Sequence, residues 1–513
     1  MRELNILDCT LRDGGYVNNW NFSDNDIKGI TKYLDKANIE FIELGYLSKI
    51  KEERGTIYNS FDKIKRIDIP LKKKIVMINY GEYPLEEIPK EDGSIFAIRV
   101  VFKKEQWRKA LIYSKELIEK NYRVFLQPMQ TIAYKDKELL DLIDETNKIS
   151  AQALYIVDSF GEMTKEDLLR ITSIYSHNLN KNIIMGFHSH NNFQLSFSLA
   201  IEFLKLNIVQ KKIVDSSVYG MGRGAGNLNT ELFTSYLNKN RHINYEIEYI
   251  LKIMDLYIEK IYQKEKWGYN LGHFLSASLG CHPNYASYLL EKVNMSIEVI
   301  KDILERIPQE ERSIFNKSLI ESLYILHQRE ILSEITFSEE IDIKLQENIL
   351  ILAPGPSIIR DLDKIKKFIY TKKNLTIISL NHQNKYINSD FILFTNDKRY
   401  EEFKENCIKN EKIIISSNIK KDEYIDYIID YELYSKNGKE NLSSDILFNF
   451  IEKNKKIKKI YIAGMDGYYK NKENYIFETI STKNLDELNF KIASKIKSLK
   501  KETEFLTESI YNN

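Results

Sequence analysis

The sequence predicts an α/β protein in which an N-terminal (β/α)8 TIM barrel is followed by a helical appendage and a smaller Rossmann-like α/β domain. Short apolar, β-branched runs recur in the first half of the chain at intervals of roughly 20 to 40 residues, which is the room that a parallel crossover needs. Helical periodicity replaces this pattern in the middle of the chain, and strand-like runs return afterwards. We therefore expect domains at residues 1–240, 241–335 and 346–513.

Eight apolar runs mark the expected barrel strands. They are "LNIL" (4–7), "FIEL" (41–44), "KIVMI" (74–78), "IFAIRVV" (95–101), "RVFLQ" (123–127), "ALYIV" (153–157), "IIMGF" (183–187) and "KIVD" (212–215). A closed barrel is the simplest architecture for eight consecutive strand and helix units. The first crossover helix is expected after Ser23, because this serine can cap a segment whose apolar residues recur at helical spacing.

Residues 241–335 show helical patterns such as "MSIEVIKDILERI" and "SLIESLYILHQ". We expect this segment, with its aromatic-rich part "WGYNLGHFLSASLGCHPNYASYLL", to be a helical appendage on the barrel. After a charged connector, strand-like runs resume and alternate with helical ones, which predicts a doubly wound domain. These runs are "NILIL" (348–352), "NLTIISLN" (374–381), "DFILFTND" (390–397), "KIIISSN" (412–418) and "KIYIAGMDGYY" (459–469).

The composition narrows the class of protein. The chain has 513 residues, and its 75 Lys and Arg nearly balance its 74 Asp and Glu, which argues against binding to nucleic acid or an anionic membrane through net charge. Cys9, Cys281 and Cys407 match no zinc or disulfide spacing. No apolar run approaches the length of about 20 residues that crosses a bilayer. We expect a cytoplasmic protein that binds no nucleic acid and has no membrane span.

Polar residues directly follow several of the expected barrel strands. Parallel strands of a barrel all end at one rim, so these side chains are expected to share one site. They are Asp8, Arg12 and Asp13 after the first run, Glu43 in the second, Asp158 after the sixth, His188 and His190 after the seventh, and the segment from Asp215 to Gly226 after the eighth.

His188 and His190 are two residues apart at a strand end, so their imidazoles project to the same side. Such a pair alone is more often an ordinary hydrogen-bonded pair, but Asp13 can supply a third ligand and makes a metal site the favoured interpretation. Two imidazoles and one carboxylate with open positions suit Mn²⁺, Mg²⁺ or Fe²⁺ better than structural zinc. An α-keto acid could chelate such an ion, and Arg12 could then hold the charge of an enolate.

The glycine-rich segment "SSVYGMGRGAGNLNTE" follows the eighth run. Its spacing matches neither a Walker A loop nor a dinucleotide fingerprint. One interpretation is a tight loop whose glycines supply positive φ angles. The other is that Asn227 reaches toward the metal or the substrate, and the sequence leaves both open.

Taken together, these motifs resemble the DRE-TIM metallolyases, the group that includes 4-hydroxy-2-oxovalerate aldolase, 3-hydroxy-3-methylglutaryl-CoA lyase and isopropylmalate synthase. The matching segments are "DCTLRDGG", "IELG", "DSFG", "HSHNN" and "GMGRGAGNLNTE", in the family's order, and the aldolase branch is the most similar. The resemblance implies a Mn²⁺ or Mg²⁺ held by Asp13, His188 and His190, with Asn227 beside it or as an occasional ligand. It also implies that Arg12 stabilises the enolate, and that Glu43 and Asp158 are active-site carboxylates or loop anchors.

Tyr16 is a departure from this family pattern, because the aldolases carry a histidine as acid and base at this distance after the arginine. An ordinary tyrosine has a pKa of about 10 and is a poor base at neutral pH. Tyr16 is therefore expected to donate a proton or to shape the pocket. The resemblance to the aldolases also implies that the helical segment covers the mouth of the barrel. His273, Cys281 and His282, in this segment, are expected to be structural.

The C-terminal domain resembles bacterial family 42 sialyltransferases, which bind a cytidine nucleotide, through "APGPSI", "SLNHQNKYINSDFILFTND", "NLSSDILFNFI" and "KKIYIAGMDGYY". The strand, turn and helix at "LILAPGPSI" could also place backbone N–H groups against a phosphate or ribose. The resemblance implies that Gly355, Ser357 and Asn381 face a nucleotide or nucleotide-sugar, that Ser443 and Ser444 follow at a helix start, and that His382 could be a base. The alternative is a non-catalytic module.

The expected function is that of a divalent-metal-dependent aldolase or lyase acting on an α-keto acid and an aldehyde. A sugar-like aldehyde would fit the transferase-like companion domain and a role in surface-glycan or nucleotide-sugar biosynthesis. Two alternatives remain at this level: an acyl-CoA Claisen-type synthase, and a catalytically reduced barrel that acts as a binding or scaffold partner. A homodimer is also compatible with the resemblance.

Overall fold

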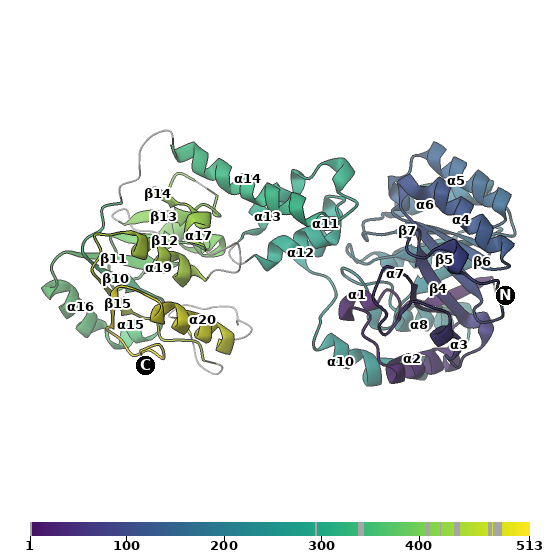
Figure 1. Cartoon of the computed structure of the whole chain (residues 1–513), viewed down its shortest axis with the longest axis horizontal. Helices are drawn as coiled ribbons and strands as arrows, with labels where there is room; N and C mark the ends of the chain where they lie inside the picture. Colours follow the sequence, from purple (N-terminus) through teal and green to yellow (C-terminus); the bar gives the residue numbers. More distant parts are fainter. Residues whose placement is uncertain are drawn as a thin grey trace. The chain divides into compact units, whose positions relative to one another are not determined.

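The computed structural model describes residues 3–292, 295–336, 343–406, 411–420, 422–435, 442–469, 474–475 and 485–512. The chain divides into two compact units, Met1–Pro283 and Asn284–Asn513. Each unit is built around its own parallel sheet with helices packed against it (Figure 1). No helix of the described residues is long and apolar enough to span a membrane.

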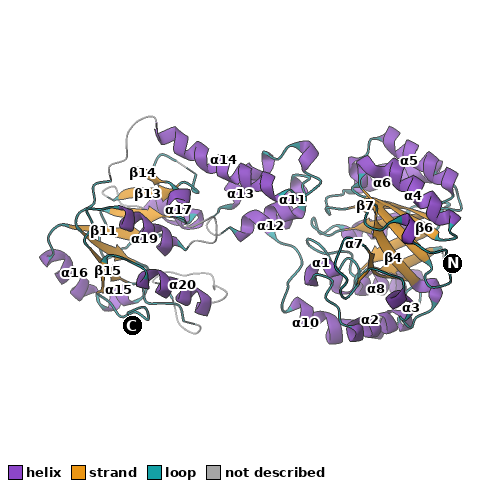
Figure 2. Ribbon diagram, in the orientation of Figure 1, coloured by secondary structure: helices purple, strands orange, loops and turns teal. Residues whose placement is uncertain are grey.

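The first unit is a closed barrel of parallel strands, drawn in orange in Figure 2. Its strands are β1 (Leu4–Asp8), β2 (Phe41–Leu47), β4 (Lys74–Asn79), β5 (Ala97–Phe102), β6 (Arg123–Pro128), β7 (Ala153–Asp158), β8 (Ile184–Ser189) and β9 (Lys212–Ser216). β1 pairs with both β2 and β9, which closes the sheet, and the short β3 (Ile57–Tyr58) pairs with β2 outside the ring. The TIM barrel and its eight predicted strands are confirmed.

Helices surround the barrel because each crossover packs an apolar face on the sheet. They are α2 (Asp24–Lys36), α3 (Asp62–Lys65), α4 (Trp107–Glu119), α5 (Asp136–Ile149), α6 (Lys165–Asn178), α7 (Ser196–Lys205) and α8 (Thr230–Arg241), and the short α1 (Gly15–Asn18) follows β1. The predicted cap of α2 is present: Ser23 and Asp26 form a reciprocal capping box.

The interior of the barrel changes from apolar to charged along the strands. Toward their N-terminal ends, inward side chains such as Phe41, Ala97 and Ile213 form a buried apolar cluster. Two residues further along the same strands lie Glu43, Arg99 and Asp215, which are also buried. Because inward positions alternate along a strand, these charged groups form the next layer of the same interior and the floor of the C-terminal rim.

The helical segment after the barrel is divided between the two units. In the first unit lie α9 (Ile247–Ile253), the π-helical turn Met254–Ile258, α10 (Glu259–Tyr262) and α11 (Leu271–Ser278). With the second unit lie α12 (Pro283–Glu291), which starts at the boundary, α13 (Ile297–Glu305) and α14 (Lys317–Thr336). The boundaries of the expected appendage, 241–335, therefore differ from the compact units, and its cover over the barrel mouth stays a prediction.

The second unit has an open, all-parallel sheet in the order β14-β13-β12-β11-β10-β15-β16. The strands are β10 (Asn348–Leu352), β11 (Leu375–Leu380), β12 (Phe391–Phe394), β13 (Lys412–Ser416), β14 (Tyr427–Ile429), β15 (Lys459–Ala463) and β16 (Glu502–Phe505). Its helices are α15 (Ser357–Arg360), α16 (Leu362–Thr371), α17 (Asp397–Phe403), α18 (Tyr431–Tyr434), α19 (Ser443–Lys453) and α20 (Leu485–Lys497). The Rossmann-like architecture is confirmed, and the strand order reverses between β10 and β15.

Candidate active site

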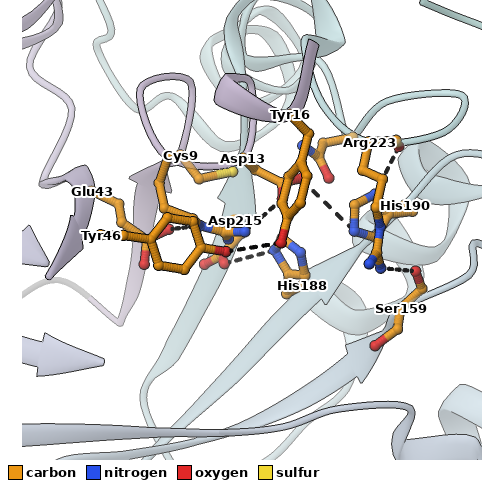
Figure 3. Close-up of polar contacts among 12 residues, drawn as sticks. Cys9, Asp13, Tyr16, Glu43, Tyr46, Ser159, His188, His190, Asp215 and Arg223 are labelled. Atoms are coloured by element: carbon orange, nitrogen blue, oxygen red, sulfur yellow. Dashed lines mark hydrogen bonds and ion pairs between the residues drawn. The ribbon is translucent and has the colours of Figure 1, made fainter. Parts of the chain in front are cut away.

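A cavity of about 290 Å³ lies at the C-terminal end of the barrel strands. Its lining residues come from β2, β7, β8 and the loops after β1, β7, β8 and β9 on one side, and from β4, β5, β6 and the loops after them on the other. Figure 3 shows the first side, where several predicted residues converge. The predicted residues that line this cavity are Arg12, Asp13, Tyr16, His188 and His190.

Asp13, His188 and His190 form a buried group whose potential ligand atoms all lie within 4.8 Å of one another. His190 Nε2 is 3.8 Å from Asp13 Oδ2, and the two imidazole planes are nearly perpendicular, at 88°. His188 Nδ1 lies 2.9 Å from Asp215 Oδ2, and His190 Nδ1 lies 3.2 Å from the carbonyl oxygen of Arg223. Since these oxygens accept hydrogen bonds, both Nδ1 atoms carry the proton and both Nε2 atoms keep a lone pair.

The chemistry of this group fits a divalent cation. Burial opposes the ionised form of Asp13, but the charge of Arg12 outweighs it and lowers the pKa of the carboxyl group well below its usual range. Burial lowers the pKa of His190 to about 3, which keeps the imidazole neutral. One carboxylate and two imidazoles are oxygen and nitrogen donors of the kind that Mn²⁺ and related ions bind.

Arg12 donates hydrogen bonds to two carboxylates and still has one donor nitrogen without a partner among the described residues. Its Nε donates to Glu43 Oε2 at 2.6 Å and its Nη1 donates to Asp13 Oδ1 at 2.5 Å. Its Nη2 is buried and has no hydrogen-bond partner in the described part of the chain. A buried donor of this kind is costly unless a ligand satisfies it, so Arg12 can bind a negatively charged oxygen in the cavity. Glu43 does not line the cavity and contacts the site through Arg12.

Asn227 and the neighbouring glycines have features of both interpretations of the glycine-rich segment. Its Nδ2 donates to Asp13 Oδ2 at 2.5 Å, and its Oδ1 is buried without a hydrogen-bond partner. A Cβ atom at Gly222 would lie 2.1 Å from Asn227 Nδ2, so the loop can approach only with glycine there. Gly224 and Gly226 have positive φ angles of 67° and 87°, as a tight loop requires.

Tyr16 stands at the mouth of the cavity, with 39% of its surface exposed. Its hydroxyl oxygen is 3.2 Å from that of Tyr46, and the guanidinium carbon of Arg223 lies 5.6 Å from its ring centroid. The ring also meets Trp20 edge-on at 4.7 Å. The tyrosine that replaces the family histidine is therefore fixed in place and presents a phenol to the cavity.

Comparisons with known proteins agree with this geometry. Residues 100–257 match the HMGL-like family. The barrel carries an HMGL-like domain. The resemblance to this group is thus confirmed for the barrel, while the resemblance of the second unit to sialyltransferases stays a prediction.

Several proteins are similar to the HMGL-like barrel. A 4-hydroxy-2-oxovalerate aldolase from Carboxydothermus hydrogenoformans is 27% identical over 322 residues, covering 59% of this chain and 91% of the aldolase. An oxaloacetate decarboxylase from Mycobacterium tuberculosis is 22% identical over 260 residues, covering 47% of this chain and 72% of the decarboxylase. A crystal structure of the N-terminal domain of a protein provisionally described as an aldolase, from Bacteroides vulgatus, is 27% identical with a TM-score of 0.50 and covers 56% of this chain and 96% of that domain.

Asp158 points away from the cavity of the HMGL-like barrel. Its neighbours Val157 and Ser159 line the cavity, whereas its Oδ1 accepts the backbone N–H of Glu162 at 3.0 Å. Burial raises the pKa of Asp158 to about 8. These contacts are those of a loop anchor, and a catalytic role for Asp158 stays a prediction.

His273, Cys281 and His282 lie outside the cavity lining of the HMGL-like barrel. Cys281 is buried, and the ring of His282 packs edge-on against Phe160 at 5.8 Å. Burial lowers the pKa of His282 to about 3. A structural role for all three stays a prediction, and Cys407 lies outside the described residues.

The sequence reasoning missed Arg99 and the role of Asp215. Arg99 is completely buried in β5 and contacts Asp215 through both terminal nitrogens, at 2.7 and 3.0 Å. A usable signal was present, because Arg99 interrupts the otherwise apolar run "IFAIRVV". A charged residue at an inward position of a buried strand requires a partner across the barrel.

The second unit has its own cavity, of about 310 Å³, at the point where the strand order reverses. Gly355, Asn381, Ser443 and Ser444 line it, together with Arg399. Its wall also includes the aromatic residues Tyr468, Tyr475 and Tyr511. A crevice outside the strand ends at such a reversal is the usual ligand site of an open α/β sheet.

Ser357 lies differently from the expectation. Its backbone N–H donates to Asp466 Oδ2 at 2.8 Å, its hydroxyl also bonds Asp466, and it does not line the cavity. A carboxylate of the chain itself thus occupies the start of α15. His382 is buried outside this cavity, with Nδ1 3.0 Å from the carbonyl oxygen of Leu380, and burial lowers its pKa to about 4.

Proposed function

We propose that the HMGL-like barrel is a divalent-metal-dependent aldolase or lyase that breaks or forms a carbon–carbon bond next to the keto group of a 2-oxo acid. The observation that carries this proposal is the buried group of Asp13, His188 and His190 beside the bare Nη2 of Arg12. The names of the similar aldolase and decarboxylase support the same class of substrate.

Asp13, His188 and His190 would hold the metal, with Asn227 next to them. When bound, the metal supplies a Lewis acid that polarises the carbonyl group of the 2-oxo acid. The role of the protein residues is to hold these donors ready: Asp215 and the Arg223 carbonyl orient the two imidazoles, and Asn227 and Arg12 orient Asp13.

Arg12 would bind the oxygen that becomes negatively charged in the enolate. In the cleavage direction the substrate hydroxyl loses its proton, the carbon–carbon bond breaks to give an aldehyde and an enolate, and the enolate takes up a proton to give the 2-oxo acid. Preorganised donors aimed at such a charge are a major source of rate enhancement. Tyr16 presents a phenol hydroxyl, 3.2 Å from that of Tyr46, that can hold the substrate hydroxyl oxygen. The proton that the substrate hydroxyl loses balances the proton that the enolate takes up.

The other side of the cavity supports a hydroxylated, sugar-like aldehyde. Asn79, Glu82, Lys103 and Gln106 line it. Gln127 also lines it, is only 3% exposed, and its Oε1 has no hydrogen-bond partner among the described residues. A buried acceptor without a partner is satisfied when a ligand hydroxyl donates to it. A role in glycan biosynthesis in the cytoplasm would follow from such a substrate.

A pyruvate-release assay tests this proposal. The full chain is analysed for bound metal and then incubated with 4-hydroxy-2-oxo acids whose aldehyde halves carry from zero to three hydroxyl groups. We expect release that requires Mn²⁺ or Mg²⁺, disappears with a chelator and returns with added metal. Bound metal without turnover of any substrate would contradict the proposal and favour a scaffold, and turnover only with an acyl-CoA would favour a Claisen-type synthase.

The preference for hydroxylated aldehydes has its own test in Gln127→Leu. This variant loses the amide acceptor and keeps a side chain of similar width. We expect kcat/KM for the hydroxylated substrates to fall by about tenfold, the equivalent of one lost hydrogen bond, and kcat/KM for the unhydroxylated substrate to change little. An equal loss for both substrates would remove the support for a sugar-like aldehyde.

For the second unit we propose a nucleotide or nucleotide-sugar site in the crevice between β10 and β15. Its position at the reversal of strand order supports the proposal, and so do its tyrosines and Arg399. Calorimetric titration of the full chain with CMP, UMP and AMP tests it. We expect binding that Arg399→Ala weakens and that Arg360→Ala, at an exposed arginine outside the crevice, leaves unchanged. Absence of binding by all three nucleotides would leave a non-catalytic module as the better interpretation.

A further inference from the structure

Arg99 is a buried charge that none of the proposed chemical steps uses. It lies on β5, none of its surface is exposed, and its guanidinium carbon is 4.3 Å from the ring centroid of Tyr155. It does not line the cavity. Removing a guanidinium from water costs several kcal/mol unless partners compensate it, so the chain must gain something specific from this position.

Two carboxylates on different strands compensate Arg99. Its Nη1 and Nη2 donate to the two oxygens of Asp215 at 2.7 and 3.0 Å, which is the two-point geometry of an arginine fork. Its Nε is 3.4 Å from Glu43 Oε1. Burial alone would lower the pKa of Arg99, but these carboxylates outweigh it and raise the pKa further, so the charge is permanent.

Each carboxylate also holds a residue of the candidate site. Asp215 Oδ2 lies 2.9 Å from His188 Nδ1, and Glu43 Oε2 accepts from Arg12 Nε at 2.6 Å. Arg99 therefore stands between the partner of one candidate metal ligand and the partner of the enolate-binding arginine. Figure 3 shows Glu43 and Asp215 beside the candidate site residues Asp13 and His188.

We propose that Arg99 is a positioning residue that holds Asp215 so that His188 keeps its proton on Nδ1 and its Nε2 lone pair toward the cavity. The inference rests on the proposed function, because that lone pair matters for holding a metal. The fork is essential to it: two parallel hydrogen bonds fix the rotation of the Asp215 carboxylate, and this in turn fixes the imidazole. A single charge without a fork would leave the carboxylate free to turn.

A purely structural role makes a different prediction. If Arg99 only neutralised the barrel interior, a lysine would serve equally well, since it also carries one positive charge. Arg99→Lys therefore separates the two roles, because it keeps the charge and loses the fork. Arg99→Met removes both and leaves two buried carboxylates without their cation.

The first measurement is the affinity of the full chain for Mn²⁺ by calorimetric titration. Partners behind metal-ligating histidines typically change metal affinity by about 10- to 100-fold, and we expect a loss of this size in Arg99→Lys and in Arg99→Met. The control is Lys212→Met, which removes another buried cation, on β9, whose Nζ bonds only the backbone carbonyls of Leu204 and Leu206 among the described residues. It should bind Mn²⁺ as the wild type does.

A double variant tests whether Arg99 acts through Asp215. Asp215→Asn should weaken Mn²⁺ binding by itself, and adding Arg99→Lys should cost little more, because residues that act through one contact are not additive. Full additivity would contradict the route through Asp215.

The second measurement needs no metal. Nitrogen NMR of histidine-labelled, metal-free protein reports which imidazole nitrogen carries the proton, and His188→Gln assigns the signal. We expect the Nδ1–H form of His188 in the wild type and a mixture of both forms in Arg99→Lys.

The outcomes are distinguishable from failure of the proposed function. Wild-type Mn²⁺ affinity together with an unchanged His188 tautomer in Arg99→Lys would overturn the inference. If the wild type itself bound no Mn²⁺, the proposed function would fail, and the tautomer comparison would still decide the role of Arg99. If Arg99→Met were not recovered as folded protein, Arg99→Lys would supply both readouts.

Discussion

The two sheets of this chain bring side chains together in different ways. The barrel closes on itself, so residues from β2, β5, β8, β9 and the loop after β1 meet in one buried network of side chains. The open sheet of the second unit has its crevice where the strand order reverses between β10 and β15, and its lining includes Arg399, Asp466 and three tyrosines. In the crevice region the carboxylate of Asp466 holds the start of α15.

The candidate site of the barrel therefore depends on a buried network of charged side chains, whereas the crevice of the second unit depends on its place at the reversal of strand order. In the barrel, the Asp13 carboxylate, whose pKa is strongly lowered, lies beside the neutral imidazole of His190 and a guanidinium nitrogen of Arg12 that has no partner among the described residues. We therefore expect metal ions to act on the first unit and to leave the second unaffected. The predictions below test that separation, from the largest expected effect to the smallest.

Asp13→Asn should have the largest effect. It removes the anionic ligand and the charge that holds Arg12, so metal binding should be lost and kcat/KM should fall by about 10³-fold or more, the equivalent of several kcal/mol of Lewis-acid stabilisation. Metal analysis and the pyruvate-release assay measure both. Asp466→Asn is the matched change in the second unit, and it should keep metal and activity. Equal losses in the two variants would refute the separation.

Arg12→Lys should have the next largest effect. A lysine keeps the charge but cannot bond Glu43 and Asp13 and still present a free donor, so kcat should fall by about 10²- to 10³-fold. Mn²⁺ should remain bound, because the three candidate ligands are intact. Arg108→Lys, at an exposed arginine outside the cavity, is the control. A kcat near that of the wild type would show that Arg12 does not stabilise the enolate.

Mn²⁺ should stabilise the barrel alone. A ligand at 100 times its Kd adds about 2.7 kcal/mol to the free energy of unfolding of the unit that binds it. The chain allows a clean readout, since its three tryptophans, Trp20, Trp107 and Trp267, all lie in the first unit. Urea unfolding followed by tryptophan emission should shift with Mn²⁺, whereas proteolysis in urea at sites within Asn284–Asn513, identified by mass spectrometry, should not. A shift in both would contradict a metal site confined to the barrel.

Much of the fold could be predicted because parallel strands are buried on both faces. The eight barrel strands appear as continuous apolar runs, and so do five strands of the second sheet. β14 is only three residues long, and β16, with the sequence ETEF, has a half-exposed pattern without an apolar run, so both escaped prediction.

The residues of the candidate site could be predicted where they lie close to strand ends. They could not be predicted where their role depends on a side chain that is distant in the sequence. His188 lies near the end of β8, His190 comes directly after it, and Asp13 lies in the loop after β1; the three meet in one buried group. The role of Arg99 depends on its contact with Asp215, which lies 116 residues later in the chain and across the closed barrel. Ser357 was predicted to face a ligand, but its N–H donates to Asp466, which lies 109 residues later in the chain. Local sequence gives no sign of this pairing.

Glu162→Gln should have the smallest effect, and its sign depends on pH. Burial, with the charge of Asp167, raises the pKa of Glu162 from 4.5 to about 7. The folded protein therefore holds a proton that the unfolded chain releases, and raising the pH from 4.5 to 7 lowers the free energy of unfolding.

Glutamine is neutral throughout, so Glu162→Gln should match the wild type near pH 4.5 and exceed its stability by about 1 to 3 kcal/mol above pH 7. Urea unfolding followed by tryptophan emission measures this difference across the range. Asp397→Asn is the counterpart in the second unit, where burial raises the pKa of Asp397 from 3.8 to about 6. Its gain should appear at lower pH and should be absent from the tryptophan signal. A Glu162→Gln difference that does not change with pH would show that this carboxyl group is ionised in the folded barrel.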